Sequence, residues 1–405
     1  MRAASRAPRV DQRPTSVPIY QTATFASADA AELGDVLMDR EPGYAYSRID
    51  NPTSAALAAA VAELEGAEAG YAFASGMAAI HAALVSLLRA GDRVVCARAV
   101  YGSTRSQLTN VLRRLGVTTE FVDVTDHAAV DAALSAAPTR VLYAETISNP
   151  TIVVADHRAL AALARRHGAA YVVDNTFASP YLCRPIELGA DLVIESATKY
   201  LGGHSDVLAG IVSGSKEAIR RVRDVQVDTG GTLAPVSAFL VLRGVATLVL
   251  RMERHAATAW ALAAWLERQE GVLRVYHPSL ASHPQHAVAA RQLAIGGGML
   301  AVELVGGQAA GRAFIDGLSI TELTASLGSV HTMVVHPPST THRHLDEAAL
   351  VDAGIAPGLL RVSVGLEDLD DLVADFERAL GAARAVAAKV TAVPSGQPAT
   401  AARRA

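Results

Sequence analysis

The sequence of 405 residues has few cysteines, few lysines and no long apolar run. Its two cysteines, Cys96 and Cys183, are too few for a disulfide framework, and neither stands in a Cys-x-x-Cys or Cys/His ligand spacing. This composition favours a reducing cytoplasm and predicts no metal site. Because no apolar segment has the character of a signal peptide or a membrane helix, we expect no membrane association.

Positive charge is supplied mainly by arginine, since Lys199, Lys216 and Lys389 are the only lysines. The formal net charge is −4, and no Lys/Arg run could follow a phosphate backbone, so nucleic acid is not expected as a partner. A function that needs a lysine amine therefore has three candidate residues.

The length and the 51% hydrophobic content predict one large and one small domain. Between residues 71 and 215, short apolar runs alternate with amphipathic stretches, which is typical of an α/β fold with a mostly parallel, seven-stranded sheet. Ligands of such sheets bind at the carboxyl ends of the strands. Strands are expected at 71–74, 93–97, 118–123, 140–144, 170–174, 191–195 and 209–213. Helices are expected at 78–89, 103–115, 127–136 and 156–167.

The remaining segments differ in character from this alternating region. Residues 1–50 lack periodicity and predict an N-terminal arm, while residues 51–243 contain the expected sheet. Residues 244–388 mix strand-like and helical runs and predict a smaller α+β domain; one long helix is expected at 235–268. The tail, 389–405, is rich in Pro, Ser and Ala and is expected to be disordered.

Lys199 is the candidate for imine chemistry. It follows the apolar run DLVIE, and a lysine desolvated at a strand end has a lowered pKa and a neutral amine available for a Schiff base. The ordinary alternative is a lysine that extends from the strand end into water. Lys216 lies at a solvated helix start and Lys389 beside the tail, so Lys199 is the only credible site if the protein forms an imine.

Asp174 and Tyr101 lie where they could bind an aromatic cofactor. Asp174 ends the run YVVD, and a carboxylate there can keep the pyridine nitrogen of pyridoxal 5′-phosphate (PLP) protonated. It could equally cap the following loop. Tyr101, in the loop AVYGST, could stack on a pyridine ring or simply pack against the protein.

Ser75, Gly76 and Met77 lie between an expected strand and an expected helix. The free backbone N–H groups and the positive end of the helix dipole would face the carboxyl edge of the sheet, which predicts a phosphate site. Ordinary helix capping by Ser75 explains the same residues without a ligand.

Several segments together resemble the Cys/Met-metabolism family of PLP-dependent enzymes, which includes cystathionine γ-synthase, cystathionine γ-lyase, methionine γ-lyase and O-acetylhomoserine sulfhydrylase. The resemblance covers roughly residues 15–385 and implies PLP fold-type I, similar to aspartate aminotransferase. It also implies a small amino-acid substrate and a homotetramer of two dimers that share active sites between chains. The segments are YSRIDNPT (46–53), ASGMAAI (74–80), VYGST (100–104), VVDNTFASP (172–180), SATKYLGGHSD (196–206) and LLRVSVGLEDLDDL (359–372).

The resemblance assigns roles to residues at matching positions. Lys199 matches the lysine that holds PLP, Asp174 the acid at the pyridine nitrogen, and Tyr101 the stacking tyrosine that protonates the leaving group. Tyr46 and Arg48 match a pair that reaches the phosphate of the neighbouring subunit. The phosphate-binding set is matched by Ser75, Gly76, Met77, Ser196 and Thr198. The clamp on the substrate α-carboxylate is matched by Arg361, Asn149 and Ser326.

Three positions depart from patterns within the family. Ser103 stands where methionine γ-lyases have Cys and several other members Gly. His331 stands where cystathionine-handling members have Glu, and the following HPPSTTH (336–342) resembles sulfhydrylases and methionine γ-lyases. Gln226 lies near a position where methionine γ-lyases carry Lys. We interpret Ser103 and His331 as substrate-facing positions.

The expected reaction is elimination or replacement at the γ-carbon of methionine, homocysteine or an O-acylhomoserine. Lys199 would remove protons from the α- and β-carbons, and Tyr101 would protonate the leaving group. Two alternatives remain open: β-elimination of the cystathionine β-lyase type, and a catalytically silent family member with a binding role. The clustering of Lys199, Asp174, Tyr101 and Arg361 argues against silence, because gathered polar groups carry a desolvation cost.

Overall fold

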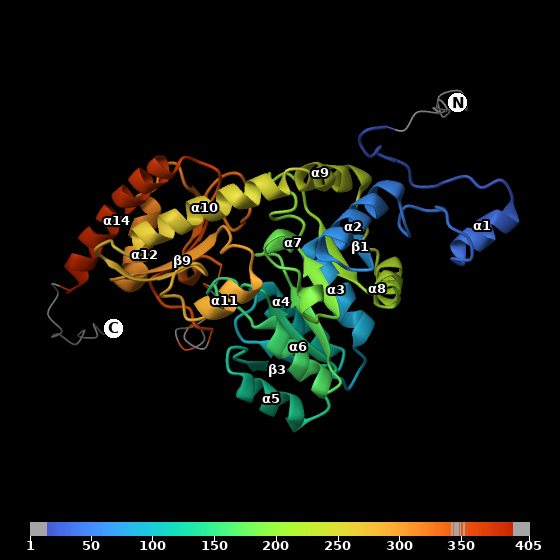
Figure 1. The fold of residues 1–405 in the computed structure, drawn as a ribbon, viewed down its shortest axis with the longest axis horizontal. Helices are drawn as coiled ribbons and strands as arrows, with labels where there is room; N and C mark the ends of the chain where they lie inside the picture. Colours follow the sequence, from blue (N-terminus) through green and yellow to red (C-terminus); the bar gives the residue numbers. More distant parts are fainter. Residues whose placement is uncertain (1–13, 342, 344–347, 349, 351–352, 392–405) are drawn as a thin grey trace, which may run out of the picture.

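The computed structural model describes residues 14–341, 343, 348, 350 and 353–391 (Figure 1). The described chain forms two β-sheets, each with its own helices, and an N-terminal arm that extends away from both. Three parts of the sequence-based predictions fall outside the described residues: the first thirteen residues of the arm, His342, and the expected tail from residue 392 onward.

The larger sheet has seven strands in the order β1-β7-β6-β5-β4-β2-β3. Only β7 runs antiparallel to its neighbours, so the predicted α/β fold with a mostly parallel sheet is confirmed. Every strand lies within two residues of its predicted position, because continuous apolar runs mark strands buried on both faces. The strands are β1 (Ala69–Phe73), β2 (Arg93–Ala97), β3 (Thr118–Val122), β4 (Val141–Glu145), β5 (Ala170–Asp174), β6 (Leu192–Glu195) and β7 (Gly210–Gly214).

Helices cover both faces of this sheet. One hydrophobic cluster is formed with α3 (Gly76–Leu87), α5 (His127–Ala136), α6 (His157–Arg166) and α8 (Lys216–Thr229). A second includes α2 (Pro52–Glu65) and α9 (Pro235–Val245), with the short elements α7 (Ser179–Leu182) and η3 (Pro185–Leu188) nearby. The helix predicted at 103–115 is instead α4 (Gly102–Ser106), followed by the π-helical segment η2 (Gln107–Leu112). Such π-helical segments often occur near functional sites.

The smaller sheet has five strands in the order β10-β11-β12-β9-β8, antiparallel except for the β10–β11 pair. With its helices it forms the left half of the molecule in Figure 1, the predicted α+β unit. Its strands are β8 (Val272–Tyr276), β9 (Met299–Leu304), β10 (Glu322–Leu323), β11 (Met333–Val335) and β12 (Leu359–Ser363). Its helices are α10 (Leu248–Leu266), α11 (His286–Gln292), α12 (Gly307–Asp316), η4 (Pro337–Ser339) and α14 (Leu369–Thr391).

The prediction of a single helix at 235–268 is wrong. The chain forms α9 and α10, which meet at an angle of 61°. Thr247 leaves the helical region, with φ −114° and ψ 11°, and the Gly244 carbonyl accepts a hydrogen bond from the Arg251 guanidinium at 2.7 Å. Among the described residues, no single helix has the length and apolar composition of a membrane span; α9 and α10 meet that criterion only as a bent pair, and both contribute residues to the core.

The arm contains a helix that its sequence pattern did not predict, α1 (Ala30–Leu37). No residue of α1 is buried, and Figure 1 shows it well separated from the two sheets. Asp29 caps its first turn by accepting from the N–H groups of Ala31 and Glu32, each at 2.9 Å. The helix was missed because it has capping signals but buries no apolar face within this chain.

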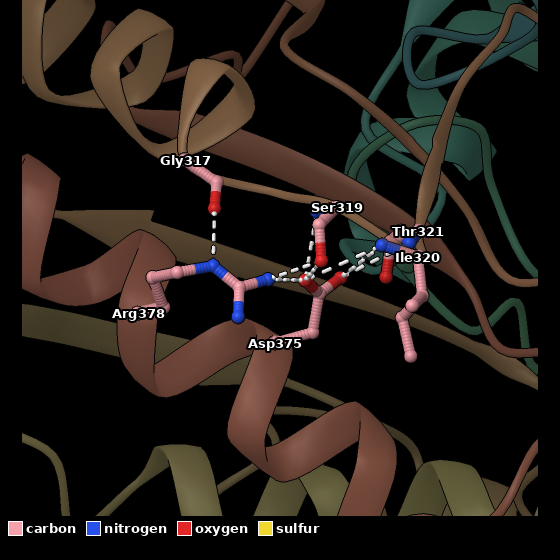
Figure 2. A network of polar contacts seen from close by, with 6 residues as sticks. All are labelled: Gly317, Ser319, Ile320, Thr321, Asp375 and Arg378. Carbon is pink, nitrogen blue, oxygen red and sulfur yellow. Dashed lines mark hydrogen bonds and ion pairs between the residues drawn. The ribbon is translucent and has the colours of Figure 1, made fainter.

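The loop before β10 is held by the carboxylate of Asp375, on α14 (Figure 2). Asp375 accepts hydrogen bonds from the N–H groups of Ser319 at 2.8 Å and Thr321 at 3.0 Å. Arg378, one turn later, pairs with Asp375 and also donates to the Gly317 carbonyl at 3.1 Å. This network fixes the start of the segment that leads to Ser326.

Candidate active site

A cavity of about 570 Å³ opens at the carboxyl edge of the seven-stranded sheet. Its wall includes the ends of β4 and β5, the loop after β6, the start of α3 and one residue of β12 from the smaller sheet. The structure therefore brings most of the predicted site residues together in one place. They are Ser75, Gly76, Met77, Tyr101, Ser103, Asn149, Asp174, Ser196, Thr198, Lys199 and Arg361.

The start of α3 offers a site for an anion. Ser75 is the N-cap, in extended conformation, and its Oγ accepts from the N–H of Ala78 at 3.1 Å. A Cβ on Gly76 would lie 2.7 Å from the Cβ of Ser196, so only glycine allows this close approach. The N–H groups of the first turn and the helix dipole suit a phosphate between Gly76 and Ser196.

Lys199 lies in a turn that follows β6, and its amine faces the smaller sheet. Its Nζ donates to the Oγ of Ser326 at 2.9 Å. Burial, aided by the positive charge of Arg361, lowers the pKa of the Lys199 amine to about 8. The Lys199 amine is therefore neutral in a much larger fraction of molecules near neutral pH than an ordinary lysine, as a nucleophilic amine requires.

Asp174, the last residue of β5, is a buried carboxylate at the base of the cavity. Its Oδ1 accepts from the N–H of Thr176 at 3.0 Å. Burial raises the pKa of Asp174 despite the hydrogen bonds from Thr176. No ion pair joins Asp174 to an Arg or Lys within the described chain, so its surroundings fit a cationic ligand such as a protonated pyridine.

Arg361, on β12, is buried and only partly satisfied. It donates to Asn149 Oδ1 at 3.0 Å and to the Ser326 carbonyl at 2.8 Å, while its Nε has no hydrogen-bond partner among the residues that the structure describes. Burial lowers the pKa of the Arg361 guanidinium to about 10, so it remains charged at neutral pH. A buried guanidinium with an unused N–H is suited to bind a carboxylate.

Glu145 is a site residue that the sequence reasoning missed. It is the last residue of β4, it lines the cavity, and it pairs in register with Asp174 on β5. Its Oε1 accepts from the N–H of Tyr101 at 2.6 Å and its Oε2 from the N–H of Asn149 at 3.0 Å. The available signal was a carboxylate at a strand end beside Asp174, but the predicted strand stopped one residue earlier.

These contacts link six residues in series, which we call the site chain. Within Asn149 and Ser326 the link runs through covalent bonds, because each uses a backbone group on one side and a side-chain group on the other. The site chain starts at the backbone of Tyr101 and ends at the amine of Lys199, so it joins the predicted proton donor to the predicted base. Its members in order are Tyr101, Glu145, Asn149, Arg361, Ser326 and Lys199.

The predicted phosphate partners of the arm lie outside this cavity. Arg48 donates to the Val227 carbonyl and lies 5.5 Å from the ring centroid of Tyr46. Neither residue lines the cavity of its own chain. Gln226 is buried beneath the arm, where its Nε2 donates to Thr232 Oγ1 at 2.7 Å and to the Arg48 carbonyl at 3.3 Å.

Of the two positions predicted to face the substrate, one lines the cavity and the other does not. Ser103, on α4, lines the cavity close to Tyr101. His331 is exposed and is not part of the cavity wall, so the structure does not bring its side chain to the substrate space. The Oγ of Ser326 contacts Lys199, while only the carbonyl of Ser326 contacts Arg361.

Known proteins resemble this chain along most of its length. An L-methionine γ-lyase of Pseudomonas putida is 47% identical over 367 residues, which cover 90% of this chain and 92% of that protein. A cystathionine β-lyase of Lactococcus lactis subsp. cremoris is 43% identical over 366 residues, covering 90% and 93%. The structure of cystathionine γ-synthase from Xanthomonas oryzae pv. oryzae with aminoacrylate and cysteine matches with a TM-score of 0.87 and 38% identity, covering 92% and 94%.

These likenesses agree with the predicted chemistry at the γ-carbon, with β-elimination as the alternative. The likeness to the solved structure of cystathionine γ-synthase confirms the predicted fold-type I. A family profile described as Cys/Met metabolism PLP-dependent enzyme matches residues 2–381. The cavity fits PLP, because it offers an anion site at the start of α3, the Lys199 amine of lowered pKa, and the Asp174 carboxylate, which has no cationic partner among the described residues. The chain belongs to the Cys/Met metabolism family of PLP-dependent enzymes.

Proposed function

We propose that this enzyme catalyses γ-elimination on methionine or homocysteine, and that it can exchange the γ-substituent of an O-acylhomoserine. The observation that carries the proposal is the site chain, which links a carboxylate clamp to an amine of lowered pKa within one cavity. The P. putida relative, named as a methionine γ-lyase, supports methionine as a substrate.

PLP would be held by three groups that the structure brings to the cavity wall. The first turn of α3, with Ser196 and Thr198, would bind the phosphate, and Asp174 would bind the pyridine nitrogen. Lys199 would hold the carbonyl carbon covalently. Bound PLP supplies an electron sink that stabilises negative charge on the substrate α-carbon.

Side chains of this chain would bind the substrate and transfer the protons. Arg361 and Asn149 would hold the substrate α-carboxylate, because the unused Nε of Arg361 offers a further donor. Lys199, once freed by the substrate amine, would take the proton from the α-carbon and then a proton from the β-carbon. The hydroxyl of Tyr101, whose side chain is 43% exposed at the cavity wall, would protonate the leaving group.

We also propose a homotetramer of two dimers in which Tyr46 and Arg48 complete the phosphate site of the neighbouring chain. The arm supports this proposal, since it leaves large apolar side chains exposed. Those are Ile19, Tyr20, Leu33, Leu37, Met38 and Tyr44. Exposed apolar side chains in such number indicate a contact surface.

The proposed units are an arm (1–50), a PLP-binding domain (51–243), a C-terminal domain predicted at 244–388 and a tail predicted at 389–405. The predicted start of the tail is wrong, because α14 continues to Thr391 and residues 389–391 are helical. The two sheets support the division between the second and the third unit. We propose the cytoplasm as the location, supported by Cys96 and Cys183, which are free and buried.

A panel of amino acids read out as the identity of the released 2-oxo acid tests the reaction. We expect 2-oxobutyrate from methionine, homocysteine and O-acylhomoserine, with cystathionine a poor substrate; an added thiol should divert O-acylhomoserine to a thioether. The L. lactis relative, named as a cystathionine β-lyase, favours a second candidate, β-elimination. Pyruvate as the main product, with cystathionine as the best substrate, would establish β-elimination. A colourless, inactive protein would indicate a catalytically silent family member with a binding role.

A further inference from the structure

We propose that Glu145 is a positioning residue: it fixes the backbone of Tyr101 and the backbone of Asn149 to the end of β4, and so sets the distance between the proton donor and the carboxylate clamp. The inference deepens the proposed function and rests on it, because Tyr101 and Asn149 are site residues of that reaction. In this role Glu145 acts through the backbones of Tyr101 and Asn149, which its two carboxylate oxygens bind.

The geometry of Glu145 supports this role directly. Its side chain is buried, and its two oxygens serve different loops: Oε1 accepts from Tyr101 N–H at 2.6 Å and Oε2 from Asn149 N–H at 3.0 Å. Tyr101 is 44 residues away in the sequence and Asn149 only four. Because both donors are backbone groups, the positions of the two loops, rather than of single side chains, depend on this carboxylate.

Glu145 also occupies a critical place in the site chain. On one side of it lies only Tyr101; on the other lie Asn149, Arg361, Ser326 and finally Lys199. Without Glu145 the predicted proton donor has no hydrogen-bonded connection, through this chain, to the clamp and the base. The three groups must keep a common geometry during elimination, since misplacement by a fraction of an ångström slows a positioned proton transfer.

A carboxylate is costly at this position. Burial raises the pKa of Glu145 well above its ordinary value, and the neighbouring Asp174 raises it further, while the two N–H donors oppose the shift. Within the described chain, no Lys or Arg forms an ion pair with Glu145. A glutamine or an apolar residue would avoid this desolvation, so the presence of a glutamate here is explained by its pair of acceptors.

Glu145→Gln tests the proposal in the holoenzyme, because glutamine keeps the shape but replaces one acceptor by an NH2 donor. The NH2 would face a backbone N–H, and one of the two loops would be released. Release of the Tyr101 loop should lower kcat with little change in KM. Release of the Asn149 loop should raise KM and weaken binding of L-alanine, followed by the absorbance of the bound cofactor. We expect a change of about tenfold to a hundredfold in one of these quantities, with altered visible circular dichroism.

Glu120→Gln is the matched control, since Glu120 lies on β3 of the same sheet with a side chain that is 48% exposed. It should change neither L-alanine binding nor the dichroism. The proposal is overturned if Glu145→Gln loses thermal stability but keeps the wild-type kcat, dichroism and L-alanine affinity. If Glu145→Gln does not fold, Glu145→Asp replaces it, because its shortened side chain cannot reach both loops; if neither folds, Glu145 serves folding and the proposal is wrong.

L-alanine binding and dichroism need no bond at a γ-carbon to break. The Glu145 proposal and the proposed γ-elimination can therefore fail independently. A wild-type enzyme that binds L-alanine but releases no 2-oxobutyrate refutes the reaction alone, whereas an unchanged Glu145→Gln variant of an active enzyme refutes the positioning role alone.

Discussion

Lys199 differs from the other two lysines in its surroundings. Lys216 and Lys389 are exposed, whereas Lys199 is partly buried and its amine has a pKa of about 8. Borohydride reduction of the purified enzyme should therefore fix the cofactor to Lys199 alone, as read by peptide mass. Lys199→Ala should remain folded and lose the covalent bond, while Lys216→Ala should keep it. A reduced cofactor found on any other residue would contradict the assignment.

Tyr101 combines a fixed backbone with a side chain at the cavity wall. In Tyr101→Phe the ring remains but the hydroxyl is lost, so we expect kcat to fall by about tenfold to a thousandfold while KM changes less, because the proton is needed when the leaving group departs. Steady-state kinetics with methionine measure both values. A rise in KM with an unchanged kcat would show that Tyr101 contributes only to substrate binding.

At the scale of elements, the ends of β4, β5 and β6 carry two sets of residues on opposite sides. Glu145, Asp174 and Ser196 face the cavity. Their sequence neighbours Thr146, Asn175 and Glu195 belong instead to a buried network behind the cavity. In this network Tyr171 bonds to His157 at 2.7 Å and His157 to Thr146 at 3.0 Å. Thr146 bonds to Asn175 at 2.7 Å and Asn175 to Glu65 at 3.0 Å, and Glu195 lies beside Glu65. We call this set the rear network.

Donors and acceptors in the rear network permit one direction of bonding. Asn175 Nδ2 donates to Glu65 and to the Cys183 carbonyl at 2.9 Å, so its Oδ1 must accept the Thr146 proton. Thr146 Oγ1 then accepts from Nε2–H of His157, which leaves Nδ1 to accept from the Tyr171 hydroxyl. Burial lowers the pKa of His157 to about 4, so the ring is neutral as this assignment requires.

Glu65 makes the stability of this edge of the sheet depend on pH between mildly acidic and neutral values. Burial raises the pKa of Glu65 from 4.5 to about 7, so between these values the folded protein holds a proton that the unfolded chain has released. The stabilisation from protonated Glu65 is fully present below its pKa in the unfolded chain, and it is lost as pH rises through its pKa in the folded protein. We expect Glu65→Gln to flatten the fall of Tm between about pH 5 and pH 8. Glu63→Gln, an exposed change on the same helix, should leave the profile as in the wild type.

Asp375 should produce the opposite dependence. Burial would raise its pKa, but hydrogen bonds from Thr321, Ser319 and Ile320 outweigh this and hold the pKa below 3.8 (Figure 2). Its contribution is therefore present above the unfolded pKa and lost as pH falls through the folded one. Asp375→Asn should lower the free energy of unfolding by about 1–3 kcal/mol at pH 7 and by less in acid. Chemical denaturation at both pH values measures this, with the exposed Glu377→Gln as control; an equal loss at both values would contradict the linkage.

At the scale of the whole molecule, the proposed arm exchange predicts complementation. A Lys199→Ala chain and an Arg48→Ala chain, each nearly inactive alone, should regain about a quarter of wild-type activity after statistical mixing, because one site of each mixed dimer receives both intact halves. Lys199→Ala mixed with Asp174→Ala is the control, since those residues act within one chain. Absence of recovery, with subunit exchange confirmed by mass, would show that the arm serves its own chain.

The sequence predicted what depends on local pattern and missed what depends on distant contacts. β2 and β5 lie at the predicted residues because a continuous apolar run specifies a buried strand by itself. The break between α9 and α10 was missed, because the contacts around it are distant in sequence: Gly244 packs so closely on Gly202 that a Cβ would lie 2.2 Å from the Gly202 carbonyl oxygen. Glu145 was missed because the predicted strand ended one residue before it, and because its partner Tyr101 lies 44 residues away in the sequence.

The corner between α9 and α10 also limits how this enzyme can move. Gly244 lies against Gly202, and Arg251 donates to the Tyr200 carbonyl at 2.7 Å, so the corner grips the loop that follows Lys199. A hinge motion at this corner would therefore displace the Lys199 amine whenever the C-terminal half rotated. Gating of substrate entry is therefore expected from the rim of the cavity, where Tyr101 lies, while the lysine stays stationary as an anchor.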